Sequence, residues 1–75
     1  MNEKNIVLNN VEAAKDFVKA ASECDFDIDV YFNRIALDAK SLLGILSLDL
    51  RNQLRVCYSG ENVGFNTVLA KYAVQ

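Results

Sequence analysis

The chain has 75 residues, of which 52% are hydrophobic and 24% are charged, and its formal net charge is −2 at pH 7. A chain of this length has one small core, because it buries only about 60% of the surface that its unfolded form exposes. We therefore expect a single domain over residues 1–75. The apolar content excludes a disordered chain, and the longest nearly apolar stretch, residues 41–50, is half the length, about 20 residues, of a membrane-spanning helix.

The residue types that are absent exclude several classes of site. The sequence contains no histidine, which excludes histidine general bases, Ser-His-Asp triads and histidine-ligated metal sites. Cys24 and Cys57 form no CxxC motif and are expected to be free thiols. The negative net charge argues against nucleic acid as a partner. The N-terminus lacks the pattern of a signal peptide, so we expect a cytoplasmic protein without membrane association.

The first third of the chain predicts a strand and a helix. Residues 3–8 end in a β-branched apolar run and are typical of a short strand. Asn9 and Asn10 both suit a helix N-cap, and Asn9 with Glu12 fits a relaxed capping box. Apolar residues then recur at helical spacing from Val11 to Ser22 and predict a helix with one apolar stripe. The stripe comprises Val11, Ala14, Phe17, Val18 and Ala21.

The middle of the chain predicts a β-hairpin. Residues 26–32 alternate in polarity, as in an antiparallel strand with one buried face. A turn is expected at Asn33 and Arg34, with strain at Arg34 if its φ must be positive. Residues 35–39 form the returning strand. The residues expected to face the core are Phe26, Ile28, Val30 and Phe32, with Ile35 and Leu37 or their neighbours, whereas Asp27, Asp29 and Tyr31 face outward.

The last part of the chain predicts a short helix, a strand and a final helix. Ser41 is a plausible N-cap for a helix over residues 42–48, which Gly44 weakens by about 1 kcal/mol relative to alanine. Residues 54–58 alternate again, and after the turn SGEN the spacing predicts a helix over residues 63–73. The inward residues of these two elements are Leu54, Val56 and Tyr58, then Phe65, Val68, Leu69, Tyr72 and Ala73.

The resulting order, β-α-β-β-α-β-α, predicts an α+β open-faced sandwich in which three helices cover one face of a four-stranded antiparallel sheet. The open face would carry Asp27, Asp29, Arg55 and Cys57, with Arg55 opposite one of the two aspartates on a neighbouring strand. Three aspartates, at positions 25, 27 and 29, invite a metal-site interpretation. A solvated sheet face is the better one, because no loop wraps around them. Cys57 has no neighbour that would activate its thiol.

Three segments resemble the HPr family, the small histidine phosphocarriers of the bacterial sugar phosphotransferase system. They are SECDFDIDVYFN, KSLLGILSLDL and CYSGEN. The segment KSLLGILSL is similar to the regulatory-serine helix of that family, and the family pattern runs without a gap from Ser22 to Leu48. The resemblance implies the same βαββαβα fold and a protein that is not an enzyme and has no cofactor.

The chain departs from the family at the active histidine. The family carries a motif of Gly, a hydrophobic residue, His, Ala, Arg and Pro before the first helix, where this chain has LNNVEAA. The histidine, arginine and proline positions fall at Asn10, Glu12 and Ala13. An asparagine amide cannot accept and pass on a phosphoryl group, and Glu12 would repel a phosphate that an arginine would bind. We therefore expect no phosphate transfer through histidine.

The resemblance also implies a second site. Ser41 matches the serine that a dedicated kinase phosphorylates in HPr proteins, and Lys40 stands beside it. The exposed apolar residues that dock partners in the family correspond to Leu42, Leu43 and Leu46. The implied partners are enzyme I, an HPr kinase-like protein and a transcriptional regulator of catabolite repression. The added phosphate would carry a charge of about −1.5 to −2.

Other interpretations remain open from the sequence. Ser41 would cap its helix whether or not it is phosphorylated, and the three leucines would serve the core if the helix were covered. Asn10 is more typical of an ordinary N-cap than of an anion site. The chain as a whole could be a structural or interaction module, monomeric or weakly homodimeric, that retains no phosphotransferase role. A phosphocarrier that uses another residue is a third possibility, which the lack of histidine opposes.

Overall fold

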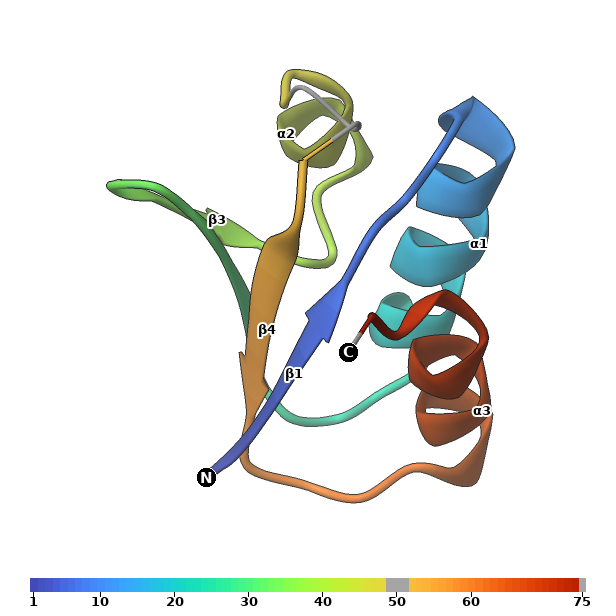
Figure 1. The fold of residues 1–75 in the computed structure, drawn as a ribbon. Helices are drawn as coiled ribbons and strands as arrows, with labels where there is room; N and C mark the ends of the chain where they lie inside the picture. Colours follow the sequence, from blue (N-terminus) through green and yellow to red (C-terminus); the bar gives the residue numbers. More distant parts are fainter. Residues whose placement is uncertain (49–51, 75) are drawn as a thin grey trace.

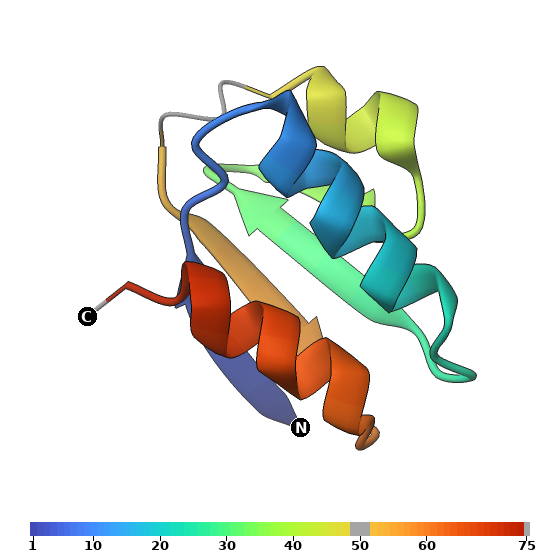
Figure 2. The same ribbon diagram turned by 90° about the vertical axis from the view of Figure 1, so that its right-hand side faces the viewer.

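The computed structural model describes residues 1–48 and 52–74 and has the element order β-α-β-β-α-β-α (Figure 1). The elements are β1 (Asn2–Ile6), α1 (Val11–Ser22), β2 (Ile28–Phe32), β3 (Ile35–Asp38), α2 (Leu42–Leu46), β4 (Leu54–Tyr58) and α3 (Val63–Tyr72). The strands form one antiparallel sheet in the order β1-β4-β2-β3. All three helices lie against one face of the sheet, and the other face is open (Figures 1 and 2). The predicted open-faced sandwich is confirmed.

The core lies between the sheet and the helices. Phe17 of α1 meets Phe65 of α3 with ring centroids 5.9 Å apart, and Tyr58 of β4 meets Phe65 edge-on at 5.3 Å. These three rings join both long helices to β4, one of the two inner strands of the sheet. The largest fully buried side chains are Phe17, Phe65, Ile6, Leu8, Ile28, Ile45, Leu54, Val30 and Val56.

The start of α1 differs from the sequence prediction in two ways. The N-cap is Asn10, whose Oδ1 accepts a hydrogen bond from the amide of Ala13 at 2.8 Å. The predicted capping box of Asn9 with Glu12 is therefore wrong, because the cap stands one residue later and bonds the amide three positions on. The helical spacing places Val11 on the apolar stripe, but the structure shows it 47% exposed, whereas Ala13 is buried. The buried face of α1 thus begins at Ala13, and Val11 remains partly exposed to solvent.

The strand β1 ends at Ile6 and does not continue to residue 8, because the next residues turn toward the end of α3. The amide of Val7 donates to the carbonyl of Tyr72 at 3.0 Å, and the amide of Val74 donates to the carbonyl of Asn5 at 3.0 Å. The residues that follow α3 therefore pair with the last part of the outer edge of β1. For the same reason α3 ends at Tyr72, and Ala73, predicted to be helical and buried, is exposed.

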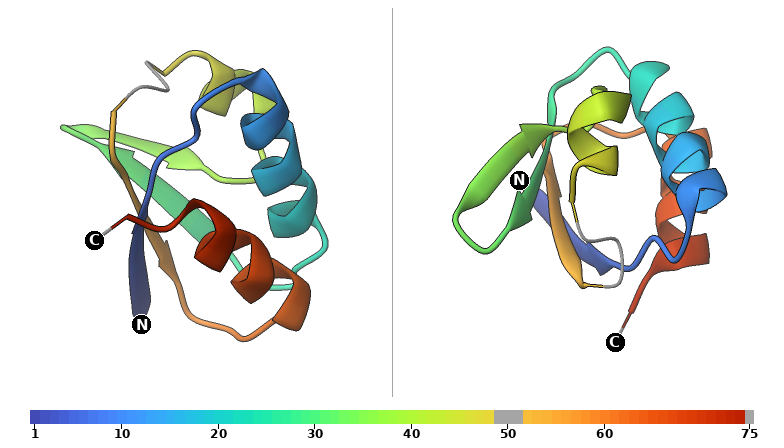
Figure 3. Two further views of the ribbon diagram at one scale, coloured as in Figure 1. Left: turned by 45° about the vertical axis from the view of Figure 1, so that its right-hand side comes forward. Right: turned by 90° about the horizontal axis from the view of Figure 1, so that it is seen from above.

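The hairpin of β2 and β3 turns at Asn33 and Arg34 as predicted. Asn33 has a φ of 54° and is the one non-glycine residue with positive φ in the described ranges, so no strain falls on Arg34. Ile35 pairs with Phe32 but is 47% exposed, contrary to the expectation that it faces the core. The reason is visible in the view from above, where the hairpin tip extends away from the helices (Figure 3).

The observed elements β2, β3, α2 and α3 are each shorter than the predicted ranges, by one or two residues.

On the open face, Arg55 lies opposite Tyr31, with its guanidinium 4.9 Å from the ring centroid, and Cys57 lies opposite Asp29. The predicted pairing of Arg55 with an aspartate is thus wrong, because the register of β2 on β4 is fixed by Val30 opposite Val56 in the core.

Three general findings concern the described part of the chain. Within residues 1–48 and 52–74, His, Cys, Asp and Glu side chains form no group of three or more that could hold a metal ion. None of the helices described there has both the length and the apolar character needed to span a membrane. Both cysteines are free, and Cys24 is buried against the core.

Candidate functional site

Ser41 stands at the start of α2, as the sequence predicts. Its backbone is extended, with φ −99° and ψ 101°, and its Oγ accepts a hydrogen bond from the amide of Gly44 at 3.2 Å. The side chain is exposed to solvent. The hydroxyl therefore caps the helix and is at the same time accessible from outside.

Gly44 leaves room for this cap. A Cβ at this position would lie 3.2 Å from the Oγ of Ser41 and 3.7 Å from a methyl group of Leu37. The first of these distances is tighter than ordinary van der Waals contact, so an alanine would press on the capping hydroxyl. The glycine lowers helix propensity, and the cap together with the fully buried Ile45 holds the short helix in place.

Lys40 has a structural role that sequence reasoning missed. Its ammonium donates to the carbonyl of Cys24 at 2.9 Å, and its amide donates to Oδ1 of Asp38 at 2.9 Å. The side chain thus joins the segment after α1 to the start of α2. The contact spans sixteen positions in the chain, which no local pattern reveals.

The three leucines of α2 are not equivalent. Leu43 is 84% exposed, whereas Leu42 and Leu46 are partly buried and pack against the core. We call the exposed parts of Ser41, Leu42, Leu43 and Leu46 the α2 surface. Asp49 and Leu50, the last letters of KSLLGILSLDL, lie outside the described residues.

The three positions that the sequence resemblance predicts for the active site hold ordinary features of a helix start. Asn10 uses its side chain to cap α1. Glu12 is exposed and lies 3.9 Å from the ammonium of Lys15. Ala13 is buried, so its methyl group belongs to the core. The three positions lie together at the first turn of α1. Glu12 is the charged residue among them, and it places a negative charge at this turn.

Asp16 joins the first and last helices beside this turn. Its Oδ2 accepts a hydrogen bond from the hydroxyl of Tyr72 at 2.9 Å and lies 3.4 Å from the ammonium of Lys71. The Tyr72 hydrogen bond is the main cause that holds the pKa of Asp16 below its usual range, and Lys71 adds to it against the opposing effect of burial. The three residues border an open hollow of about 570 Å³ with Asn10 and Glu12.

We expect this contact to make stability depend on pH. Because the pKa of Asp16 is lower in the folded state, its contribution is complete above the unfolded pKa and is lost as the pH falls through the folded pKa. The variant Asp16→Asn should therefore be less stable than the parent near pH 7, and the difference should vanish at strongly acidic pH. Urea denaturation at several pH values measures this, with Asp25→Asn as the exposed control. An Asp16→Asn deficit that persists unchanged into acid would contradict the assignment.

The sheet with three helices on one side and the serine-capped short helix define a small α+β sandwich domain. The family model described as "PTS HPr component phosphorylation site" matches residues 10–62. The chain belongs to the HPr family of the phosphotransferase system. Proteins of this family are phosphocarriers rather than enzymes, and they interact with other proteins of the phosphotransferase system.

A solved structure supports the same assignment. The chain is similar to HPr-C-His from Thermoanaerobacter tengcongensis, whose crystal structure it matches with a TM-score of 0.76 and 26% sequence identity. The match covers 95% of this chain and 89% of that chain. No curated protein matches the chain significantly. The order of elements and the family thus agree with the resemblance found in the sequence.

Proposed function

We propose that this chain is a regulatory, partner-binding member of the HPr family that does not carry phosphate on histidine. Two features support the loss of phosphate transfer: the sequence has no histidine, and the matching positions hold Asn10, Glu12 and Ala13. The side-chain oxygen of Asn10 already accepts the capping hydrogen bond from the backbone amide of Ala13. A carboxylate at Glu12 repels an approaching phosphoryl group.

The observation that carries the proposal is the exposure of Leu43 beside the accessible hydroxyl of Ser41. Leu43 is 84% exposed and stands beside the partly exposed Leu42 and Leu46 on the same short helix. Contiguous apolar surface of this kind marks an interaction site. The partners are an HPr kinase-like protein or a transcriptional regulator of catabolite repression in the cytoplasm. Lys40, Leu42 and Leu46 border the contact.

Phosphorylation of Ser41 would switch this surface. The kinase forms a bond between the Ser41 Oγ and the γ-phosphorus of ATP, ADP leaves, and the hydroxyl proton passes to a base. The product adds a charge of about −1.5 to −2 at the edge of the α2 surface. A partner that buries Leu43 would then have to desolvate that charge or supply a cation for it. Phosphorylation would thus select between partners.

We expect incubation with an HPr kinase and ATP to add one phosphoryl group, about 80 Da, to the intact chain. Ser41→Ala should remove the added mass. Ser47→Ala is a matched control, because Ser47 is also exposed and stands at the other end of the same helix, and it should leave the added mass unchanged. No mass shift, with an authentic HPr phosphorylated in parallel, would contradict the regulatory proposal.

A second function is supported by the same exposed leucine. The chain could serve as an interaction module, homodimeric through the α2 surface, without a phosphotransferase role. In that case Ser41 is only the cap of α2, and the hydrogen bond to the Gly44 amide is its whole function. The oligomeric state of a Leu43 variant distinguishes the two, as argued in the Discussion.

A further inference from the structure

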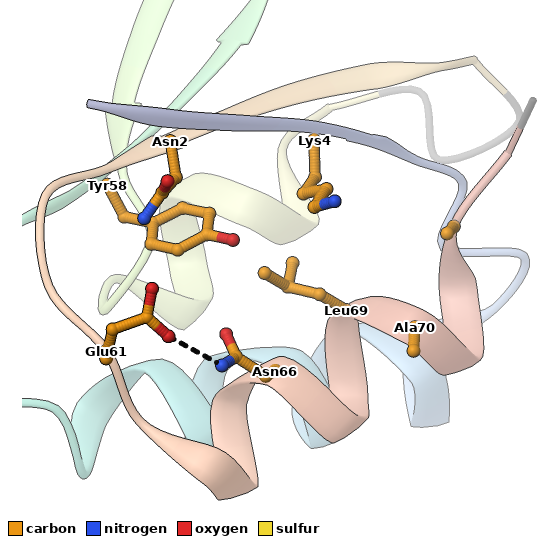
Figure 4. Close-up of a pocket in the computed structure, with 8 residues that line it drawn as sticks. Asn2, Lys4, Tyr58, Glu61, Asn66, Leu69 and Ala70 are labelled. Atoms are coloured by element: carbon orange, nitrogen blue, oxygen red, sulfur yellow. Dashed lines mark hydrogen bonds between the residues drawn. The ribbon is translucent and has the colours of Figure 1, made fainter.

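A hollow separates β1 from α3, away from α2 and from the first turn of α1. The two elements lie side by side in Figure 2, and Figure 4 shows the side chains between them. Its volume of about 540 Å³ falls within the range of small-molecule sites. It is lined by Asn2, Lys4, Tyr58, Glu61, Asn66, Leu69, Ala70 and Ala73.

A buried tyrosine directs its hydroxyl into this hollow. Tyr58 is 4% exposed, and its ring packs between Phe26 and Phe65. Figure 4 shows the hydroxyl group pointing toward the space between Lys4 and Leu69. Among the residues the structure describes, none forms a hydrogen bond with this hydroxyl. Every buried side-chain nitrogen or oxygen of the described residues has a hydrogen-bond partner, so this unpaired hydroxyl lies at the solvent-accessible wall of the hollow, where a ligand can reach it.

The hydroxyl keeps its proton under ordinary conditions. Burial raises the pKa of Tyr58, and the nearby carboxylate of Glu61 raises it further. Tyr58 therefore faces the hollow as a hydrogen-bond donor and not as an anion. An acceptor atom, such as a carboxylate oxygen, is the group that this donor satisfies.

The hollow has charged side chains at two ends and apolar side chains between them. In Figure 4 the ammonium of Lys4 lies on the strand side, and Glu61 lies across the hollow. The carboxylate of Glu61 accepts a hydrogen bond from Nδ2 of Asn66 at 3.0 Å. Lys4 has no ion-pair partner within residues 1–48 and 52–74. Leu69 and Ala70 provide apolar wall between these ends.

We propose that this hollow binds a small monocarboxylic acid with a compact apolar body. The carboxylate accepts hydrogen bonds from the ammonium of Lys4 and the hydroxyl of Tyr58, and the body lies on Leu69 and Ala70. Glu61 disfavours a second negative charge, so the site selects monoanions over dianions. No residue of the α2 surface lines the hollow, so this binding is independent of the function proposed above.

The test uses sodium benzoate as the probe, with ¹⁵N and methyl NMR of the intact chain. Benzoate should shift the Asn66 side-chain amide, the Ala70 amide and the Leu69 methyl groups along one saturable curve. Benzyl alcohol, which lacks the charge, and phthalate, which carries two, should each bind at least about tenfold more weakly, since a charge-assisted hydrogen bond is lost or a repulsion gained.

Two variants remove the proposed contacts without emptying the core. Lys4→Met keeps an unbranched side chain of similar length, and Tyr58→Phe keeps the ring that packs on Phe65. Each should raise the benzoate dissociation constant by about tenfold. Lys15→Met is the matched control, because Lys15 is an exposed lysine on α1, and it should change nothing. The proposal is overturned if benzoate and benzyl alcohol bind equally or if neither Lys4→Met nor Tyr58→Phe weakens benzoate binding. It is also overturned if Lys15→Met weakens benzoate binding as much as Lys4→Met does.

Discussion

Replacing Phe65 with alanine should remove most of the stability of the folded state. Phe65 is fully buried and contacts the rings of both Phe17 and Tyr58. Truncation of a buried phenylalanine costs about 3–5 kcal/mol, whereas a small domain is stable by only about 5 kcal/mol or a little more. Because Phe65 joins α1, α3 and β4, its loss affects the whole core. Urea denaturation followed by far-UV circular dichroism measures the change.

The matched control for this variant lies on the same helix. Val63 is 84% exposed, so Val63→Ala should change the free energy of unfolding by no more than about 0.5 kcal/mol. If Phe65→Ala and Val63→Ala had similar midpoints, the core described above would be wrong.

Replacing Leu43 with aspartate should abolish most partner binding without affecting the fold. Leu43 is highly exposed, so a charge at this position meets water in the free protein and carries no desolvation cost. In a complex it would be buried without a partner, which typically costs 2 kcal/mol or more, about 30-fold in affinity. The measurement is kcat/KM of an HPr kinase acting on Ser41. The urea midpoint serves as the check on folding.

Val63→Asp is the control for this variant, because it places the same charge at an equally exposed valine on α3. Sedimentation velocity on both variants distinguishes the two proposed functions. If the parent chain is a dimer that only Leu43→Asp dissociates, the interaction-module function is the better one. If all three proteins are monomers and only Leu43→Asp lowers the kinase rate, the regulatory function is supported. Equal kinase rates for the two variants would contradict α2 docking.

The parts of the fold that depend on neighbouring residues could be predicted from the sequence. The alternation of residues 28–32 and 54–58 follows directly from the period of a strand, and the inward residues Ile28, Val30, Leu54 and Val56 are all buried. The sequence predicts Ser41 as a cap because a hydroxyl residue directly before an apolar run is a local signal of a helix start. A helix as short as α2 cannot bury all three of its leucines, so exposure of one or two of them is expected, but only the structure identifies Leu43 as the exposed one.

The remaining features arise from contacts between distant parts of the chain. Asp16 and Tyr72 are 56 positions apart, and neither residue has a local pattern that points to the other. The position of the Tyr58 hydroxyl is also not visible in any local pattern, because the hollow that it faces is formed by the packing of α3 against β1 (Figure 4). Ile35 has the right parity for the core, and only the reach of the hairpin past the helices exposes it.

The outer edge of β1 bears on how two copies of the chain could associate. The residues after α3 pair with the end of this edge at Asn5, which leaves the stretch before it for strand addition. Two antiparallel copies related by a two-fold axis must place each residue near the axis opposite itself. A register centred on the middle of β1 would thus set Glu3 against Glu3 or Lys4 against Lys4. Like charges directly opposite each other are destabilising. The edge of β1 therefore disfavours the pairing of two copies into one continuous sheet.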